Sequence, residues 1–151
     1  MEVLERIEQQ ANTVKELSVE LRNEKSYRGT ERLIQLTLQA LLDLGLMVLS
    51  ATGASPTGYR DIAASLEERE LMTPKDAQLI RAMAGLRNIL VHGYARVDRE
   101  IIVDSSKKVP EDAVRLTDKI LSSAKLRIND PRKAATNLVE ILREALKGRA
   151  K

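Results

Sequence analysis

Apolar side chains recur at helical spacing along most of this chain. A first stretch, over about residues 2–24, places apolar residues every three or four positions, which is the period of one face of an α-helix. The residues of this face are Val3, Ile7, Val14, Leu17 and Leu21, with Leu4 and Ala11 beside them. Because the face has too few heptads for a coiled coil, the pattern predicts a helix with one side on a protein core.

A second helix is predicted over residues 31–50, after Gly29 and with Thr30 as its N-cap. It is apolar on most sides, with Leu33, Ile34, Leu36, Leu38, Leu41, Leu42, Leu44, Leu46, Met47, Val48 and Leu49. A helix of this kind has to be buried on several sides. We expect that burial either within the monomer or at an interface between subunits.

Two later helices share one start signal, a capping residue followed directly by proline. Thr73-Pro74 opens a helix that is expected to end near Gly93, and Asp130-Pro131 opens one that runs to about residue 147, before Gly148. A short helix over about residues 60–70 is predicted upstream of them. It follows a loop that contains Gly53, Pro56 and Gly58.

The segment 95–109 gives the weakest local signals. Residues 101–103, Ile-Ile-Val, fit a short strand or a helical turn, and residues 105–108, Ser-Ser-Lys-Lys, are typical of a loop. Pro110 is the expected start of a helix to about residue 126. The whole pattern predicts an all-α protein, an up-and-down bundle of five to six helices in a single domain over residues 1–151.

Composition narrows the chemistry. The chain has no Cys, Phe or Trp, three Tyr and one His. Disulfides and thiolate metal sites are therefore excluded, and a zinc site is not expected. The acidic, amphipathic N-terminus does not resemble a secretory signal, and the longest apolar run, residues 44–49, is too short to cross a bilayer. We expect a cytoplasmic protein without a membrane contact.

The two parts of the chain differ in charge. Residues 1–106 carry 13 Lys and Arg against 16 Asp and Glu, whereas residues 107–151 carry 12 against 6. A basic C-terminal region on an acidic body can attract nucleic acid or an acidic partner. It is equally well explained as a basic solvated surface.

One segment contains residues suited to catalysis, Arg87-Asn88-Ile89-Leu90-Val91-His92-Gly93-Tyr94. On a regular helix Asn88 and His92 lie about 40° apart, but Arg87 and His92 lie about 140° apart. Arg87 and His92 converge only if the helix frays at Gly93, if the Arg side chain swings around, or if they meet across a dimer axis.

The residue types of this segment suit RNA cleavage. A guanidinium binds a phosphate with two parallel hydrogen bonds, and an imidazole can transfer protons near neutral pH. RNA supplies its own nucleophile, the 2′-hydroxyl. Taken from spacing alone, an Arg and a His near a helix end are also common in helices with no catalytic role.

A polar line runs along the second helix, at Glu31, Gln35, Gln39 and Asp43. It is either the solvent side of that helix or a polar wall of the active cleft, with Asp43 orienting His92 or Arg87. Two of the three tyrosines, Tyr27 and Tyr59, are expected to be half-buried packing residues.

The segment 87–94 resembles the signature of the HEPN family, Arg followed by four to six residues and then His, in its HepT-like form with Tyr two residues beyond the His. The stretches 31–43, 56–59, 71–72 and 83–86 are similar to the rest of the family pattern. The resemblance covers roughly residues 1–103, whereas residues 105–111 and the basic last helix depart from the pattern.

This resemblance implies a HEPN-like helical homodimer whose shared cleft cleaves RNA with Arg87 and His92, without a metal or another cofactor. Independently of the resemblance, the residue types suggest supporting roles for Asn88 and Tyr94, which can orient a phosphate or a base, and for Asp43 of the polar line. The resemblance also implies a toxin paired with an MNT-type nucleotidyltransferase antitoxin, which transfers AMP to Tyr94. The alternatives are a non-catalytic HEPN subunit that binds nucleotide or RNA and docks on a nucleotidyltransferase, and a purely structural helical dimer.

Overall fold

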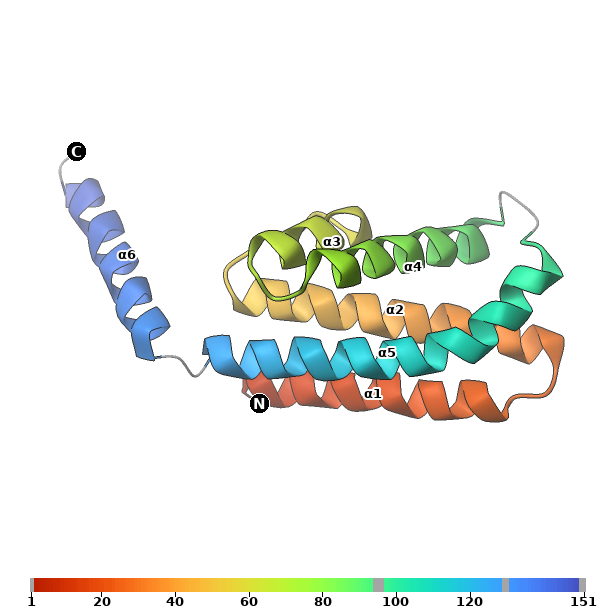
Figure 1. Cartoon of the computed structure of the whole chain (residues 1–151). Helices are drawn as coiled ribbons and strands as arrows, with labels where there is room; N and C mark the ends of the chain where they lie inside the picture. Colours follow the sequence, from red (N-terminus) through yellow and green to blue (C-terminus); the bar gives the residue numbers. More distant parts are fainter. Residues whose placement is uncertain (1, 94–96, 129–130, 150–151) are drawn as a thin grey trace.

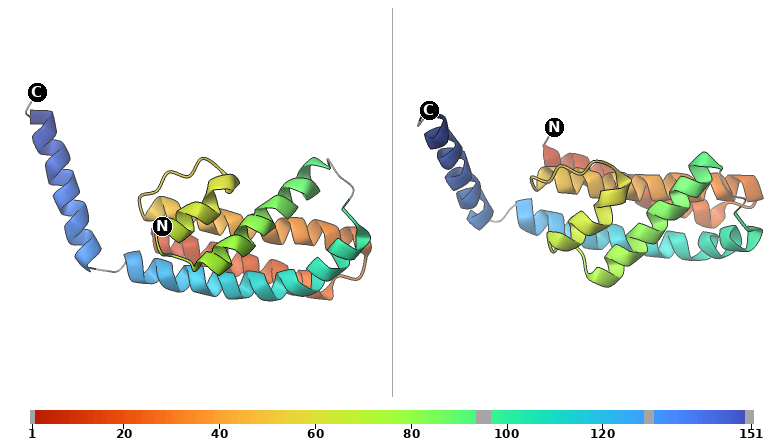
Figure 2. Two further views of the ribbon diagram at one scale, coloured as in Figure 1. Left: turned by 45° about the horizontal axis from the view of Figure 1, so that its top comes forward. Right: turned by 90° about the horizontal axis from the view of Figure 1, so that it is seen from above.

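The computed structural model describes residues 2–93, 97–128 and 131–149, and every regular element in them is an α-helix. The helices are α1 (Val3–Asn23), α2 (Tyr27–Ala51), α3 (Tyr59–Glu68), α4 (Pro74–His92), α5 (Arg99–Ile128) and α6 (Pro131–Arg149). Figure 1 shows α1, α2 and α5 side by side, with α3 and α4 covering α2. In Figure 2, α4 crosses this layer obliquely. The predicted all-α helical bundle is confirmed.

The apolar second helix, α2, is the centre of the core. Ten of its residues are buried, and α1, α3, α4 and α5 all pack against it. By length and composition alone α2 could cross a membrane, but in the bundle it behaves as a core helix. None of the large apolar side chains that are exposed in the described residues belongs to α2. We expected α2 to be buried either within the monomer or at an interface between subunits, and packing within the monomer is sufficient to cover its large apolar side chains.

The predicted start of α2 was wrong by four residues. The helix begins at Tyr27, and its N-cap is Ser26 rather than Thr30. The Ser26 hydroxyl accepts a hydrogen bond from the Gly29 backbone N–H at 3.0 Å. Gly29 lies inside the first turn of α2 and does not mark the end of a loop. A Cβ atom there would come within 2.5 Å of the carboxyl group of Glu24, an exposed and flexible side chain that can move aside.

Of the two alternatives for residues 101–103, the helical one is confirmed, because α5 is continuous from Arg99 to Ile128. The loop predicted for residues 105–108 and the helix start predicted at Pro110 were wrong, since both lie inside α5. Proline removes one helical hydrogen bond, and Figure 1 shows a bend in the first half of α5. The helix persists because Ile102, Val109 and Pro110 are buried against the bundle. The gain from that burial, about 2 kcal/mol per large apolar side chain, offsets the lost bond.

The last helix, α6, lies apart from the bundle in the three views of Figures 1 and 2. Its described side chains, over residues 138–148, are all exposed. They include Leu138, Val139, Ile141, Leu142 and Leu146. The core of this protein is therefore built by α1 to α5.

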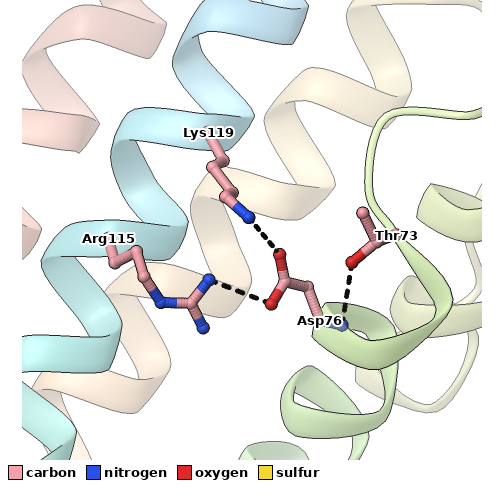
Figure 3. Close-up of polar contacts among 4 residues, drawn as sticks. All are labelled: Thr73, Asp76, Arg115 and Lys119. Carbon is pink, nitrogen blue, oxygen red and sulfur yellow. Dashed lines mark hydrogen bonds and ion pairs between the residues drawn. The ribbon is translucent and has the colours of Figure 1, made fainter.

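An ion cluster joins the start of α4 to α5 (Figure 3). The Asp76 carboxylate lies 3.0 Å from both Arg115 Nη1 and Lys119 Nζ, and its side chain is only 6% exposed. The Asp76 backbone N–H donates to the Thr73 hydroxyl at 3.2 Å, which is the predicted N-cap. Burial raises the pKa of Asp76, but the hydrogen bonds and charges of Lys119 and Arg115 outweigh burial and lower it overall.

We predict that Asp76→Asn lowers the free energy of unfolding at pH 7 by about 1–3 kcal/mol, because Arg115 and Lys119 lose a buried charged partner. The pKa of Asp76 is lower in the folded than in the unfolded chain. Its ionised form therefore stabilises the fold above the unfolded pKa, about 3.9, and this stabilisation is lost as pH falls toward the folded pKa. Urea unfolding should show the difference between wild type and variant shrinking below about pH 4.

The matched control is Asp118→Asn. Asp118 pairs with Lys15 at 2.8 Å, but the two side chains are 57% and 41% exposed. Exposed pairs of this kind contribute about 0–1 kcal/mol, so the control should unfold almost like wild type. A stability difference for Asp76→Asn that stays constant down to pH 3 would contradict the role of its ionised form.

Candidate active site

The motif residues Arg87, Asn88 and His92 lie on the C-terminal part of α4. Gly93 ends the helix in the left-handed conformation, with φ of 60°, and its N–H donates to the Ile89 carbonyl at 2.9 Å. This is the predicted termination, because a left-handed residue is accommodated best by glycine. The helix is regular up to His92, so fraying at Gly93 does not bring Arg87 and His92 together.

Arg87 points inward, over α3. Its guanidinium carbon lies 4.7 Å from the centre of the Tyr59 ring, and Nη1 donates to Asn88 Oδ1 at 3.3 Å. Its Nε is buried and has no hydrogen-bond partner among the described residues. His92 and Asn88 are exposed at the surface of α4. The regular helix thus separates Arg87 from His92 by about 140° around its axis.

Asp43 lies on α2 and contacts Tyr59 rather than a motif residue. The Tyr59 hydroxyl donates to Asp43 Oδ1 at 2.5 Å. Asp43 is therefore linked to Arg87 through the tyrosine, whereas the sequence suggested a direct contact with Arg87 or His92. The polar line of Glu31, Gln35, Gln39 and Asp43 is half-buried along its whole length, so it is not a fully solvated strip.

Tyr59 is the residue that sequence analysis did not recognise as part of this site. It is half-buried and packs on the core, as expected, and it also connects Asp43 with Arg87. Burial, together with the hydrogen bond and negative charge of Asp43, raises the pKa of Tyr59 to about 12, against the opposing charge of Arg87. The available signal was the rarity of aromatic residues, since the chain has only three.

Tyr94, the predicted supporting and modified residue, is outside the described residues. A surface groove of about 700 Å³ lies between the start of α4 and the C-terminal half of α5, away from the motif. It is lined by residues that include Glu67, Leu71, Met72 and Ser122. Neither Arg87 nor His92 lines this groove, so it is not part of the candidate site.

An all-helical bundle in which Arg87 and His92 share the end of one helix has the architecture and the motif of HEPN-type ribonucleases. The model of the HepT-like family, described as "Ribonuclease HepT-like", matches residues 1–120. This chain therefore belongs to the HepT-like ribonuclease family. The resemblance predicted over residues 1–103 is confirmed, and the match extends through most of α5.

Individual relatives agree with this assignment. The chain is 39% identical over 71 residues to a tRNA nuclease HepT of Aphanizomenon flos-aquae, over 46% of this chain and 48% of the nuclease. It is 24% identical over 106 residues to a "Putative RNase" of Archaeoglobus fulgidus, over 70% and 80% of the two chains. The chain thus spans about half the length of the first relative and four fifths of the second.

A solved structure supports the fold. The cytosolic protein YutE from Bacillus subtilis, whose function is described as unknown, superposes with a TM-score of 0.64 over 78% of this chain and 87% of its own. At 17% sequence identity, the likeness shows the helical fold alone.

Gly85 within α4 and Gly93 at its C-cap give a test of the local geometry of this helix. Gly85 lies within the helix and a Cβ atom there would have nothing within 4 Å, whereas Gly93 has a positive φ. We predict that Gly85→Ala stabilises the protein by about 0.5–1 kcal/mol through helix propensity. The same substitution at Gly93 should destabilise it by about 1–2 kcal/mol through left-handed strain.

Thermal unfolding of the two variants would measure these opposite signs. Gly93→Asn serves as the control, because asparagine tolerates the left-handed region better than alanine. If Gly93→Ala unfolds at the same temperature as Gly85→Ala, the end of α4 does not have the described conformation.

Proposed function

We propose that this chain is a metal-independent endoribonuclease and the toxin of a toxin–antitoxin pair. The observation that carries the proposal is the presence of Arg87 and His92 at the end of α4 in a chain of the HepT-like family. An imidazole can take the proton of the RNA 2′-hydroxyl, whose oxygen then forms a bond to the adjacent phosphorus. The bond from phosphorus to the 5′-oxygen breaks, and that oxygen takes a proton from a second His92, supplied by the other chain of the proposed dimer. The products are a cyclic 2′,3′-phosphate and a 5′-hydroxyl end.

In this proposal Arg87 binds the phosphate of the RNA, and His92 transfers the proton. A guanidinium stabilises the negative charge that develops on the phosphate oxygens. Asn88, which is exposed one turn before His92, is proposed to contact the same substrate. The reaction requires the RNA substrate and no cofactor. We expect it to take place in the cytoplasm.

The working unit is proposed to be a homodimer with a shared cleft. One chain has a single His, and its Arg87 and His92 leave α4 on different sides. A twofold axis brings two copies of each to one cleft, where Arg87 of one chain can meet His92 of the other. The support lies in two exposed apolar pairs, Ile89 and Val91 within the motif segment of α4 and Ile101 and Val103 at the start of α5, which are 38–46% exposed. Exposed apolar residues of this kind are typical of the centre of an interface.

The proposed regulation is by an MNT-type nucleotidyltransferase antitoxin that adds AMP to Tyr94. This part rests on the family resemblance of the sequence, since Tyr94 is outside the described residues. A phosphate attached two residues beyond His92 would occupy the anion site intended for RNA.

We predict that Arg87→Ala and His92→Ala each reduce RNA cleavage by about 100-fold or more, because each removes a charge-stabilising or proton-transferring group. Arg81→Ala, an exposed arginine on the same helix, is the matched control and should cleave like wild type. Cleavage of labelled RNA in excess EDTA, with analysis of the product ends, measures both the loss and the metal independence. Full activity of His92→Ala would contradict the mechanism, and activity only with added Mg²⁺ would contradict the metal independence.

We predict that the active protein sediments at about twice 16.9 kDa and that mixing inactive variants restores part of the activity. If each site takes Arg87 and His92 from different chains, a dimer of Arg87→Ala with His92→Ala has one site that lacks both groups and one site that keeps one of each. Each variant alone is the control. A fully active monomer would contradict the shared cleft.

We predict that co-expression with a nucleotidyltransferase antitoxin adds AMP to Tyr94. The phosphate would compete with RNA for Arg87 and so inhibit cleavage. Mass spectrometry of the peptide that contains Tyr94 measures the addition, with Tyr94→Phe as the control. Inhibition of the toxin without this mass change would show that the antitoxin acts by covering the site.

A further inference from the structure

Tyr59 connects two charged residues that come from different helices. Its hydroxyl donates to Asp43 Oδ1 on α2 at 2.5 Å, and its ring faces the Arg87 guanidinium on α4 at 4.7 Å. Tyr59 itself is the first residue of α3. Three helices therefore meet at this one side chain, and the contact with its ring sets the position of the Arg87 guanidinium relative to the core.

The way in which Arg87 is held leaves its terminal Nη donors available to a ligand, whereas its Nε is buried. In the described residues Arg87 forms no ion pair with a carboxylate, and its one hydrogen bond is the 3.3 Å contact with Asn88. A carboxylate partner would occupy the fork of N–H donors that binds a phosphate. An aromatic ring instead attracts the face of the guanidinium and leaves the N–H groups in its plane unused.

The hydroxyl of Tyr59 holds the ring in place and does not transfer protons. Burial and Asp43 raise the pKa of Tyr59 to about 12, so the hydroxyl stays protonated near neutral pH. It then donates steadily to Asp43, which is half-buried on α2. The hydrogen bond with Tyr59 also directs the Asp43 carboxylate to the hydroxyl instead of to the guanidinium.

We propose that Tyr59 is a positioning residue for Arg87: its ring supports the guanidinium, and its hydrogen bond to Asp43 fixes the ring, so that the N–H donors of Arg87 face the RNA phosphate. This role rests on the proposed ribonuclease function. If Tyr59 has this role, losing its ring should reduce RNA affinity and cleavage more than losing its hydroxyl, because the ring makes the contact with Arg87.

The test compares Tyr59→Leu, which removes ring and hydroxyl, with Tyr59→Phe, which keeps the ring. Affinity is measured with a 2′-O-methylated RNA oligonucleotide, which cannot be cleaved, and kcat/KM with unmodified RNA. Tyr59→Leu should weaken both by about 3- to 30-fold, the range expected for losing one cation–π contact. Tyr59→Phe should retain most of the affinity and activity.

The matched control is Tyr27→Leu. Tyr27 carries Arg99 at 4.5 Å in the same kind of contact, between α2 and α5 and without a motif residue. Its loss should leave RNA affinity unchanged. Thermal unfolding of all three variants shows whether each remains folded.

A double-mutant cycle separates positioning from a general structural effect. If Tyr59 acts through Arg87, Tyr59→Leu should have no further effect on RNA affinity in the Arg87→Ala background. An equal loss in both backgrounds would overturn the proposal. The ¹⁵N–¹H resonance of Arg87 Nε should also shift in Tyr59→Leu, since it lies near the ring, and an unchanged resonance would overturn the stacking itself.

These outcomes distinguish this role from the proposed function. If Arg87→Ala cleaves and binds RNA like wild type, the ribonuclease function assigned to Arg87 fails and the role of Tyr59 fails with it. If Arg87→Ala is inactive while folded Tyr59→Leu behaves like wild type, the ribonuclease function stands and only the positioning role is overturned.

Discussion

A helix that is apolar on nearly all sides has to be covered on nearly all sides, and the covering of α2 organises this molecule. Four helices pack on α2, and α3 approaches it where Gly45 has no side chain. A Cβ atom at Gly45 would lie 3.0 Å from Ile62 Cγ2, which is tighter than an ordinary van der Waals contact, so Ile62 would have to shift by a few tenths of an ångström. This close approach also brings Tyr59, one turn before Ile62, to Asp43. The burial of α2 and the construction of the candidate site therefore depend on the same contact.

The candidate site has a fixed half and an exposed half. The guanidinium of Arg87 packs on the Tyr59 ring, and Tyr59 is hydrogen-bonded to Asp43 of the core helix α2. His92, in contrast, lies at the exposed end of α4. A phosphate-binding group on a rigid support costs less conformational entropy on binding than a free side chain. Ile89 and Val91, on the same part of α4 as His92, are also exposed. One helix thus carries a supported Arg87 and an exposed His92 on different sides.

Different interactions hold the ends of α4 and α5 to the rest of the bundle. The start of α4 is held to α5 by the buried carboxylate of Asp76, and the start of α5 is held to α2 by the stacking of Arg99 on Tyr27. The C-terminal end of α5 leads into α6, which leaves the bundle with its apolar side chains exposed. The HepT-like family match also ends within α5, at residue 120. The family match thus covers most of the core that α1 to α5 build, which extends to Ala124, and α6 lies outside both the match and that core.

The sequence by itself determined the features that depend on neighbouring residues. The helix from Thr73-Pro74 to Gly93 was predicted with both ends, because a capping hydroxyl, a proline and a left-handed glycine act within one turn. The motif was found in the same way, since its residues are consecutive. Only the tertiary structure decided that α5 continues through Pro110, because burial against distant helices outweighs a local helix breaker. Only it placed Tyr59 between Asp43 and Arg87, which lie 16 and 28 positions away in the chain. Such contacts depend on how whole helices pack, and no local pattern of residues encodes them.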